Sequence, residues 1–414
     1  MSRPFSYSVH PKLARIGDLL LHNCPGGTVC ALTPTALRTA YNFSYQTGVS
    51  DGTGETIVIV DAYGSPTIKS DLTTFDKTVA NLPDPPSFQV LYSGGTPSIN
   101  LNNASELGWA EETTLDVEWT HAFAPGANII LVVANNDQGN TIQAAQQYAI
   151  GVAPQVILSL SFGVQEASIN SGANNTQLAA AHAIYEQAAS AAYNATVIAS
   201  AGDLGSTGGY AFANPQYPAS DPYVLGVGGT NLTLFNNGKY RSESAWDDGI
   251  GCAWPCGATG GAPSSIWGPF DHEADITKDA LHRDVADVAY DASDNAVAVY
   301  IGFSAPGVTP GVYAIGGTSL GPPAYAGIVA IANELRRSLS PPKAALGYIN
   351  PRLYQAYAAQ QASKAPPFHD VSAGNNIFLS GAACCTAGAG YDMPTGLGSP
   401  NVNNLLNTLV NVVQ

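Results

Sequence analysis

Short apolar runs rich in β-branched residues alternate with segments of helical periodicity, and this alternation constrains the fold of the chain most strongly. Helical patterns are clearest over residues 105–122, 141–149, 176–192 and 319–339. The runs that have the length and composition of buried strands are residues 56–61, 88–92, 128–134, 155–161, 196–201 and 223–228. Such alternation predicts an α/β fold with a mostly parallel sheet and helices on both faces.

One stretch departs from this pattern. Residues 240–295 hold Trp246, Trp254 and Trp267 among many Gly, Pro and Asp residues, so we expect long loops there. Loops carried on a rigid sheet are where substrate clefts usually form.

The charge balance of the chain excludes some classes of partner. The 414 residues include 31 Asp and Glu against 15 Lys and Arg, which gives a net charge of −16. Binding to nucleic acid or to an anionic membrane surface needs clustered Lys and Arg, so we expect neither. When the carboxylates protonate at low pH, few positive charges remain to repel one another. The charge balance therefore favours adaptation to acid over the alternative, a mildly acidic extracellular protein that works at neutral pH.

The cysteines favour an oxidising compartment, because an even number of them lies in Gly- and Pro-rich contexts typical of loops. Pairs 24/30 and 252/256 could close short loops, whereas adjacent Cys384 and Cys385 need a vicinal bridge or other partners. Zinc at Cys252 and Cys256 is disfavoured because no second paired motif lies near them. No run approaches the ~20 apolar residues of a membrane span. Because the cysteines favour an oxidising compartment, we expect a secreted protein.

A candidate nucleophile lies in the segment 316–323, Gly-Gly-Thr-Ser-Leu-Gly-Pro-Pro. Ser319 stands just before an apolar run that reads as a buried helix, so its hydroxyl would lie at a helix N-terminus, where developing negative charge is favoured. The alternative is an ordinary N-cap serine.

A serine nucleophile needs a base, and the histidines offer none in the expected setting. Seven histidines are present, but none lies in a His-Gly-Thr turn of the kind that an Asp, His, Ser order would require. An ordinary Ser-His-Asp triad is therefore unsupported.

Carboxylates are better candidates for the base. Glu112 and Asp116 are spaced i,i+4 and would share one helix face. Two close carboxyls tend to share a proton, so one of them can act as base and then as acid in an acidic medium. The alternative is a solvated acidic helix surface, which Glu111 and Glu118 fit well.

A third candidate, Asp203, follows the predicted strand 196–201 in the sequence Ala-Gly-Asp. The carboxyl end of a parallel strand is where α/β sites form. A protonated Asp203 could donate a hydrogen bond to a developing oxyanion. The alternative is a turn aspartate.

Together these three segments resemble the sedolisins, or serine-carboxyl peptidases, most closely their kumamolisin-like members. The family pattern has Glu-x-x-x-Asp on a helix, an Asp in a turn after a strand, and Gly-Thr-Ser before a buried helix. The resemblance implies a subtilisin-like fold and a peptidase active at acidic pH. Glu112 would be the base for Ser319, Asp116 would support Glu112, and Asp203 would line the oxyanion hole. Further stretches resemble the family at residues 156–163, 217–220, 227–230 and 243–246.

The resemblance also implies one structural Ca²⁺ ion near the C-terminus, because His-Asp-Val at 369–371 and the Gly-rich segment 388–396 match a calcium-binding segment of the family. Carboxylates and carbonyls are hard oxygen ligands that suit calcium. The alternative is a Gly-rich turn region without metal. The implied ligands are the side chains of Asp370 and Asp392 and the carbonyls of Val371, Gly388 and Gly390.

The chain departs from the family pattern at its start and in its loops. Sedolisins are normally made with a long propeptide, so we read residues 1–32 as an N-terminal extension or propeptide remnant and residues 33–414 as the peptidase domain. Asp61 stands where some sedolisins extend the carboxylate network with a Glu, and its shorter side chain puts contact with Glu112 in doubt. The insertion around residues 252–256 interrupts a shorter substrate-contact loop of relatives.

The sequence therefore predicts a monomeric, acid-acting serine peptidase that hydrolyses polypeptides through an acyl-enzyme on Ser319, with an endopeptidase preferred. A tripeptidyl-peptidase and a catalytically silent binding protein of the same fold are the alternatives. A sugar-active hydrolase using Glu112 and Asp116 leaves Ser319 and Asp203 unexplained.

Overall fold

The structure is a computed structural model of the chain, and it describes most of the sequence. The described residues are 5–15, 31–43, 50–169, 175–249, 256–277, 279–292, 297–360, 364–378 and 384–411. Cys24, Cys30, Cys252 and Trp254, on which parts of the sequence analysis rest, lie outside these ranges.

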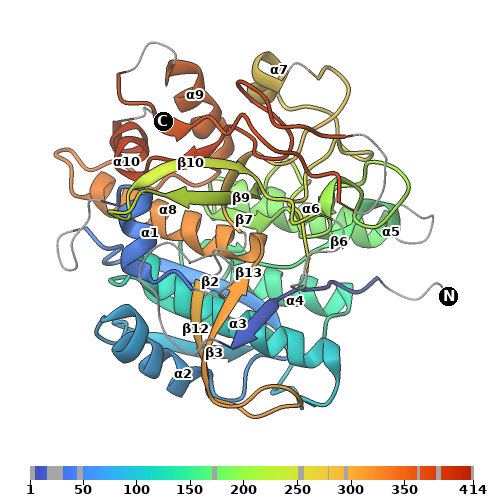
Figure 1. The fold of residues 1–414 in the computed structure, drawn as a ribbon, viewed down its shortest axis with the longest axis vertical. Helices are drawn as coiled ribbons and strands as arrows, with labels where there is room; N and C mark the ends of the chain where they lie inside the picture. The colour runs from blue at the N-terminus through green and yellow to red at the C-terminus, as the bar shows by residue number, and fades with distance from the viewer. Residues whose placement is uncertain are drawn as a thin grey trace.

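The core of the molecule is an eight-stranded sheet, and it confirms the predicted mostly parallel arrangement (Figure 1). Every paired neighbour in it runs parallel except β10, which is antiparallel to β9. The strand order is β10 (Tyr240–Ala245), β9 (Leu225–Leu234), β7 (Thr196–Ser200), β5 (Ile157–Leu160), β2 (Thr56–Ala62), β4 (Asn128–Ala134) and β3 (Phe88–Tyr92), with β11 (Val288–Asp291) beside β9.

Helices cover both faces of this sheet, as the pattern predicts. Alternate residues of β2 show why, since Ile57 packs into the core beneath α3 and α8, whereas Val58 and Val60 pack into the core on the opposite side. On the first side lie α1 (Pro34–Ala40), α3 (Ala104–Phe123), α8 (Gly321–Arg337) and α10 (Val402–Asn411), and on the second lie α4 (Gly139–Ala149) and α6 (Asn175–Ala189). The other α-helices among the described residues are α2 (Ile68–Phe75), α5 (Glu166–Ile169), α7 (Asp271–Thr277) and α9 (Asn350–Gln360).

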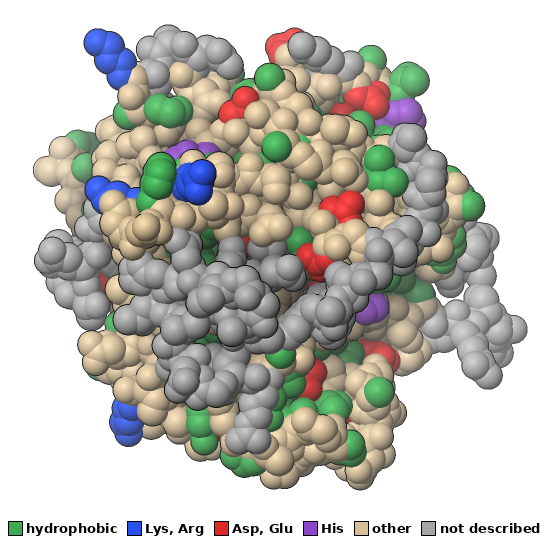
Figure 2. Space-filling model, in the orientation of Figure 1, with side chains coloured by type: hydrophobic (Ala, Val, Ile, Leu, Met, Phe, Trp, Pro, Cys, Tyr) green, Lys and Arg blue, Asp and Glu red, His purple; other side chains and the backbone are tan. Residues whose placement is uncertain are grey.

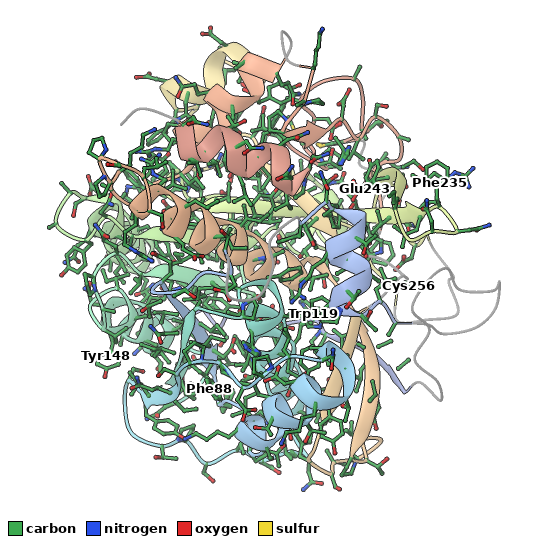
Figure 3. The ribbon with its side chains drawn as sticks, turned by 90° about the vertical axis from the view of Figure 1, so that its left-hand side faces the viewer. Phe88, Trp119, Tyr148, Phe235, Glu243 and Cys256 are labelled. Atoms are coloured by element: carbon green, nitrogen blue, oxygen red, sulfur yellow. A yellow bond between two sulfur atoms is a disulfide. The ribbon has the colours of Figure 1, made fainter. Side chains whose placement is uncertain are left out.

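Helix α3 runs through the middle of the molecule. It begins at an N-cap, Asn103, whose side-chain oxygen accepts a hydrogen bond from the Ser105 N–H. From Trp109 to Phe123 every residue is buried, and Figure 3 shows Trp119 in the interior. Its indole N–H donates to the carbonyl oxygen of Ala298, 2.9 Å away.

This burial overturns the expectation for Glu111 and Glu118, which we read as solvated. Both side chains are buried, because α3 packs against the main sheet, α8 and the strand β12 (Val297–Ile301). Glu118 accepts a hydrogen bond from the backbone N–H of Tyr300, at 2.9 Å. Burial is the largest cause that raises the pKa of each carboxyl, to about 7 for Glu111.

A second, antiparallel sheet was not predicted. It has three strands in the order β1 (Lys12–Arg15), β13 (Gly311–Gly316) and β12 (Val297–Ile301). In Figure 1, β1 is the dark blue strand beside orange β13, so the start of the chain lies against the segment that leads to Ser319.

The expectation of long loops over residues 240–295 is also wrong in part. The segment contains β10, α7 and β11, and β11 completes the main sheet by pairing with β9. Its many Gly and Asp residues disfavour regular structure locally. Three short elements nevertheless form there, because tertiary contacts override local propensity.

Among the described residues, Cys384 is joined to Cys385, and Cys256 also forms a disulfide. No helix in the described part of the chain is long and apolar enough to cross a membrane. Acidic side chains are scattered over the face drawn in Figure 2, where Lys and Arg are few.

Candidate active site

Ser319 lies in a short 3₁₀ turn, Thr318–Leu320, that leads directly into α8. The sequence predicted a helix from residue 319, and the α-helix itself begins at Gly321. Gly317 precedes the turn with φ of 140°, and a Cβ built on it would lie 2.5 Å from Oδ2 of Asp203. Only glycine fits there, so the Gly-Thr-Ser sequence serves to bring the serine turn close to Asp203.

Asp203 is hydrogen-bonded to this same turn. Its Oδ1 accepts hydrogen bonds from the backbone N–H of Thr318, at 2.8 Å, and from the Thr318 hydroxyl, at 2.7 Å. The N–H of Gly202 donates to the Thr318 hydroxyl oxygen at 3.1 Å. The carboxyl end of β7 and the serine turn are thereby held together, with the second oxygen of Asp203 facing Gly317.

Glu112 and Asp116 lie one turn apart on α3, and both are fully buried. The hydroxyl oxygen of Ser161 lies 2.7 Å from Oδ1 of Asp116 and 3.1 Å from the carbonyl oxygen of Ser319. Ser161 follows β5 directly, so the carboxyl end of that strand bridges the helix that carries the carboxylates and the turn that carries the serine. The sequence analysis quoted Ser161 only as part of a family-like stretch, and its place at a strand end was the signal.

The carboxyl of Glu112 faces Ser319. The Ser319 hydroxyl is near enough to favour the ionised form of Glu112, although their geometry falls short of a full hydrogen bond, and no other described residue bonds to either Glu112 oxygen. A buried carboxylate without such a partner in the described part of the chain needs an explanation, and a role in proton exchange supplies one.

Asp61, at the end of β2, also belongs to this cluster. Burial raises the pKa of Asp61 to about 7, and the nearby Thr113 side chain offsets this only partly. Its charge also raises the pKa of both Glu112 and Asp116, so its shorter side chain does interact with the pair. This answers the doubt that the sequence left about its reach.

The electrostatics of the cluster follow from burial and like charge. Burial is the largest cause that raises the pKa of Glu112 well above its ordinary value, and the charges of Asp61, Asp203 and Glu111 raise it further. Burial, then Asp61 and Glu112, raise the pKa of Asp116, while the Ser161 hydroxyl lowers it. Several carboxyls that cannot all ionise cheaply share protons, so the pair titrates as a unit.

Several histidines are engaged elsewhere. His121 is hydrogen-bonded to Asp76 at 2.7 Å, and His182 is hydrogen-bonded to Asp221 at 2.9 Å. Neither of these hydrogen bonds involves Ser319.

The residues of the expected calcium segment lie together. The N–H of Gly390 donates to Oδ1 of Asp370 at 3.1 Å, and the N–H of Gly388 donates to Oδ2 of Asp392 at 2.9 Å. The carbonyl oxygen of Val371 lies 3.5 Å from the Thr395 hydroxyl, which also donates to Asp392. Burial, with a smaller effect of the Asp370 charge, raises the pKa of Asp392 to about 6. Within the described ranges, no group of three or more His, Cys, Asp or Glu side chains is arranged to hold a metal.

Comparison with known proteins decides the family. The model of the Subtilase family matches residues 98–365, more than half of the chain. The chain belongs to the subtilase family. This confirms the predicted subtilisin-like fold.

The relatives of this subtilase are sedolisins. It is 33% identical to kumamolisin of Bacillus sp. (strain MN-32) over 92% of its length, and 27% identical to sedolisin of Pseudomonas sp. (strain 101) over 96%. The chain spans 64% of the length of each of these relatives. A solved structure of Pseudomonas sedolisin, a serine-carboxyl proteinase complexed with two molecules of pseudo-iodotyrostatin, matches with a TM-score of 0.76 and 25% identity, covering 92% of this chain and 98% of that one. These likenesses confirm the resemblance to the sedolisin family.

Proposed function

We propose that this subtilase is an acid-acting serine-carboxyl peptidase that hydrolyses peptide bonds through an acyl-enzyme on Ser319, with an endopeptidase preferred. One observation carries the proposal: the Ser319 turn is hydrogen-bonded to Asp203 on one side and faces the buried carboxyl of Glu112 on the other. This arrangement supplies a nucleophile, a base and an oxyanion donor without a histidine.

The reaction assigns one role to each group. The Ser319 oxygen attacks the carbonyl carbon of the scissile bond while Glu112 takes its proton. Asp203 and backbone N–H groups stabilise the oxyanion. Glu112 then gives the proton to the leaving amine, and a water molecule repeats the cycle to release the acid. Asp116 holds Glu112 in position and shares its proton.

Activity in acid follows from the buried charges. The base has to be ionised while its neighbours stay protonated, and a buried group of carboxyls cannot hold many negative charges. Because the pKa of Asp61 is about 7, a further charge develops beside Glu112 and Asp116 near neutrality. We therefore expect activity to be lost as the pH approaches neutrality.

We also propose one structural Ca²⁺ ion held by Asp370, Asp392 and the carbonyls of Val371, Gly388 and Gly390. The two carboxylates and the loop carbonyls supply the hard oxygen ligands that calcium prefers. Burial, and to a smaller extent the charge of Asp370, raises the pKa of Asp392, and a cation held between the two carboxylates would offset both effects.

We propose that the protein is secreted and acts on polypeptides as a monomer. The disulfides at Cys256 and at Cys384–Cys385 favour an oxidising compartment. The scarcity of Lys and Arg disfavours nucleic acid and anionic membranes as partners.

The test is hydrolysis of a denatured protein from about pH 2 to about pH 8 by the chain and by Ser319→Ala. The matched control is Ser338→Ala, which alters an exposed serine at the other end of α8. We expect activity confined to acid, lost in Ser319→Ala and kept in Ser338→Ala. Product masses separate internal cleavage from stepwise release of tripeptides. Activity that survives Ser319→Ala, or its absence at every pH from folded protein, would overturn the proposal.

A further inference from the structure

The disulfide between the adjacent residues Cys384 and Cys385 lies beside the segments that surround Asp203. Both cysteines are partly exposed. On their inner side they contact Met393, whose Sδ lies 3.4 Å from Sγ of Cys385 and 3.9 Å from Sγ of Cys384. The pair is therefore packed against the domain but is not sealed from solvent.

The backbone of the pair is hydrogen-bonded to two residues. The hydroxyl of Ser206 donates to the carbonyl oxygen of Cys384 at 2.6 Å. The Cys385 N–H donates to Oδ1 of Asn376 at 3.1 Å, and the Asn376 N–H donates to the carbonyl oxygen of Cys385 at 3.2 Å. Ser206 stands three residues after Asp203, so the pair contacts the turn that follows the proposed oxyanion residue.

The peptide group that joins the two cysteines makes two of these contacts. Its carbonyl oxygen is the one that binds Ser206, and its N–H is the one that binds Asn376. A disulfide between neighbouring residues closes a small ring that contains this peptide group, and closing a ring removes conformational freedom from the chain within it. The disulfide therefore fixes the group that holds Ser206 and Asn376.

Asn376 connects the pair to a glycine-rich loop. Its side chain is fully buried. While its side-chain oxygen accepts from Cys385, its side-chain nitrogen donates to the carbonyl oxygens of Gly261, at 2.9 Å, and Gly260, at 3.3 Å. Displacing this amide would leave buried polar groups without partners, which is costly. The position of the loop is therefore tied to the position of the disulfide.

The glycine-rich loop is itself bound to the segment that carries Asp203. The N–H of Gly260 donates to the carbonyl oxygen of Gly202 at 2.6 Å, and the N–H of Ala258 donates to that of Asp203 at 3.1 Å. Asp203 in turn accepts the N–H of Thr318 in the serine turn. These contacts form a continuous path from the disulfide to the serine turn.

A second path reaches Asp203 through the 3₁₀ turn Gly205–Thr207. The N–H of Ser206 donates to the carbonyl oxygen of Asn376 at 3.0 Å. Gly205 has a φ of 68°, and a Cβ built on it would lie 2.7 Å from that same oxygen. Only glycine fits so close an approach, so the turn lies directly against Asn376.

We propose that the Cys384–Cys385 disulfide is a redox-sensitive clamp on the Ser319 site. In the oxidised protein the clamp holds Asn376, and Asn376 is a positioning residue for the loop and the turn that fix Asp203. Reduction releases Asn376 and slows catalysis. The inference rests on the proposed function in one respect, since it takes Asp203 to act in hydrolysis.

The redox step is an exchange with a low-molecular-weight dithiol. A thiolate of the reductant attacks one cysteine sulfur and forms a mixed disulfide, and its second thiolate displaces the remaining cysteine sulfur. Two electrons and two protons pass to the protein, which leaves two cysteine thiols and one disulfide in the reductant. Because the thiolate is the reactive species, exchange proceeds near neutral pH and stops in acid.

The first experiment equilibrates the chain at about pH 7 with mixtures of reduced and oxidised dithiothreitol, stops exchange with acid and measures peptide hydrolysis. Alkylation and mass spectrometry report the reduced fraction of each cysteine in parallel samples. We expect kcat to fall about ten- to hundredfold with little change in KM, because a group that acts in the transition state is displaced. The midpoint of this fall should coincide with that of Cys384 and Cys385. A fall that follows Cys256 instead, or unchanged kcat in folded protein with both cysteines alkylated, would overturn the proposal.

The second experiment uses variants. The double variant Cys384→Ser, Cys385→Ser should have the kcat of the reduced chain and should not respond to dithiothreitol. The matched control, Thr386→Ala, alters the exposed side chain next to the disulfide and should keep both the kcat and the response of the parent. Parent-like kcat in the folded double variant would contradict the clamp.

Asn376→Ala tests the residue through which the clamp acts. It should lower kcat to a similar extent and remove the response to dithiothreitol, because the two changes break the same path and are not additive. Full additivity in the folded variant would show that Asn376 does not transmit the redox state. If Asn376→Ala does not fold, the titration of the parent chain decides, since it needs no substitution.

The third experiment needs no catalysis. Amide hydrogen exchange is compared between oxidised and reduced Ser319→Ala protein. Exchange should become faster over residues 202–207 and 258–261 on reduction, whereas α4 should be unchanged. Equal exchange in both forms would mean that the clamp is wrong while the peptidase function stands. Faster exchange at these segments without hydrolysis by any form of the chain would mean that the clamp stands and the proposed function falls.

Discussion

The buried carboxyl of Asp61 should make the protein less stable as the pH rises. Burial raises the pKa of Asp61 in the folded state to about 7, from an ordinary value of 3.8 that applies to the unfolded chain. The folded state therefore binds the proton more tightly, and the resulting stabilisation is complete below pH 3.8 and is lost as the pH rises through about 7. The total is about 4 kcal/mol, or about 1.4 kcal/mol per pH unit within that window.

The assay is urea unfolding at several pH values across this window, for the chain and for Asp61→Asn. The amide cannot ionise, so the fall in the free energy of unfolding with pH should be shallower in Asp61→Asn by about 1.4 kcal/mol per pH unit. Asp275→Asn, at an exposed position on α7, is the control and should keep the parent slope. Parallel curves for the chain and Asp61→Asn would refute the reasoning, because they would mean that Asp61 ionises equally well in both states.

Three further predictions concern the serine turn, the bridging serine and the calcium segment. Gly317→Ala should lower the free energy of unfolding in urea by about 1–3 kcal/mol and abolish activity, since it combines a strained φ with a clash against Asp203. The control Gly209→Ala, at a glycine with positive φ but nothing within 4 Å of the added Cβ, measures the strain alone. Equal losses of stability in the two variants would contradict the clash. Ser161→Ala should lower kcat about ten- to hundredfold and move the pH profile to higher pH, because the pKa of Asp116 rises when the hydrogen bond is lost; an unchanged profile would contradict this. Calcium at about a hundredfold above Kd should stabilise the chain by about 2.7 kcal/mol in thermal unfolding, but not the Asp370→Asn variant, and no effect of a chelator would contradict the site.

The local parts of this molecule could be predicted from the sequence. The parallel strands and α3 are continuous patterns with the right period, and Ser319 and Asp203 stand beside the elements that position them. The sequence could not show that Glu118 is buried or that Asp61 interacts with Glu112, because these depend on which strands become neighbours. Such pairing is a property of the whole chain.

The N-terminal segment holds a signal that the sequence analysis did not use. Phe5, Tyr7 and Val9 alternate with polar residues, the period of a strand with one buried face. The pattern is short and stands in a region without other regular structure. Its partners, Gln138 and Gly163, are more than a hundred residues away along the chain, so sequence alone gives no reason to pair them.

The most direct test of the central claim, that Ser319 is a nucleophile activated by Glu112, is covalent labelling with a serine-reactive fluorophosphonate at acidic pH, mapped by mass spectrometry. The account predicts one adduct, on Ser319, that is strongly reduced in Glu112→Gln and unchanged in Ser338→Ala. An adduct on another residue, or equal labelling of Ser319 in the Glu112→Gln protein, would contradict it.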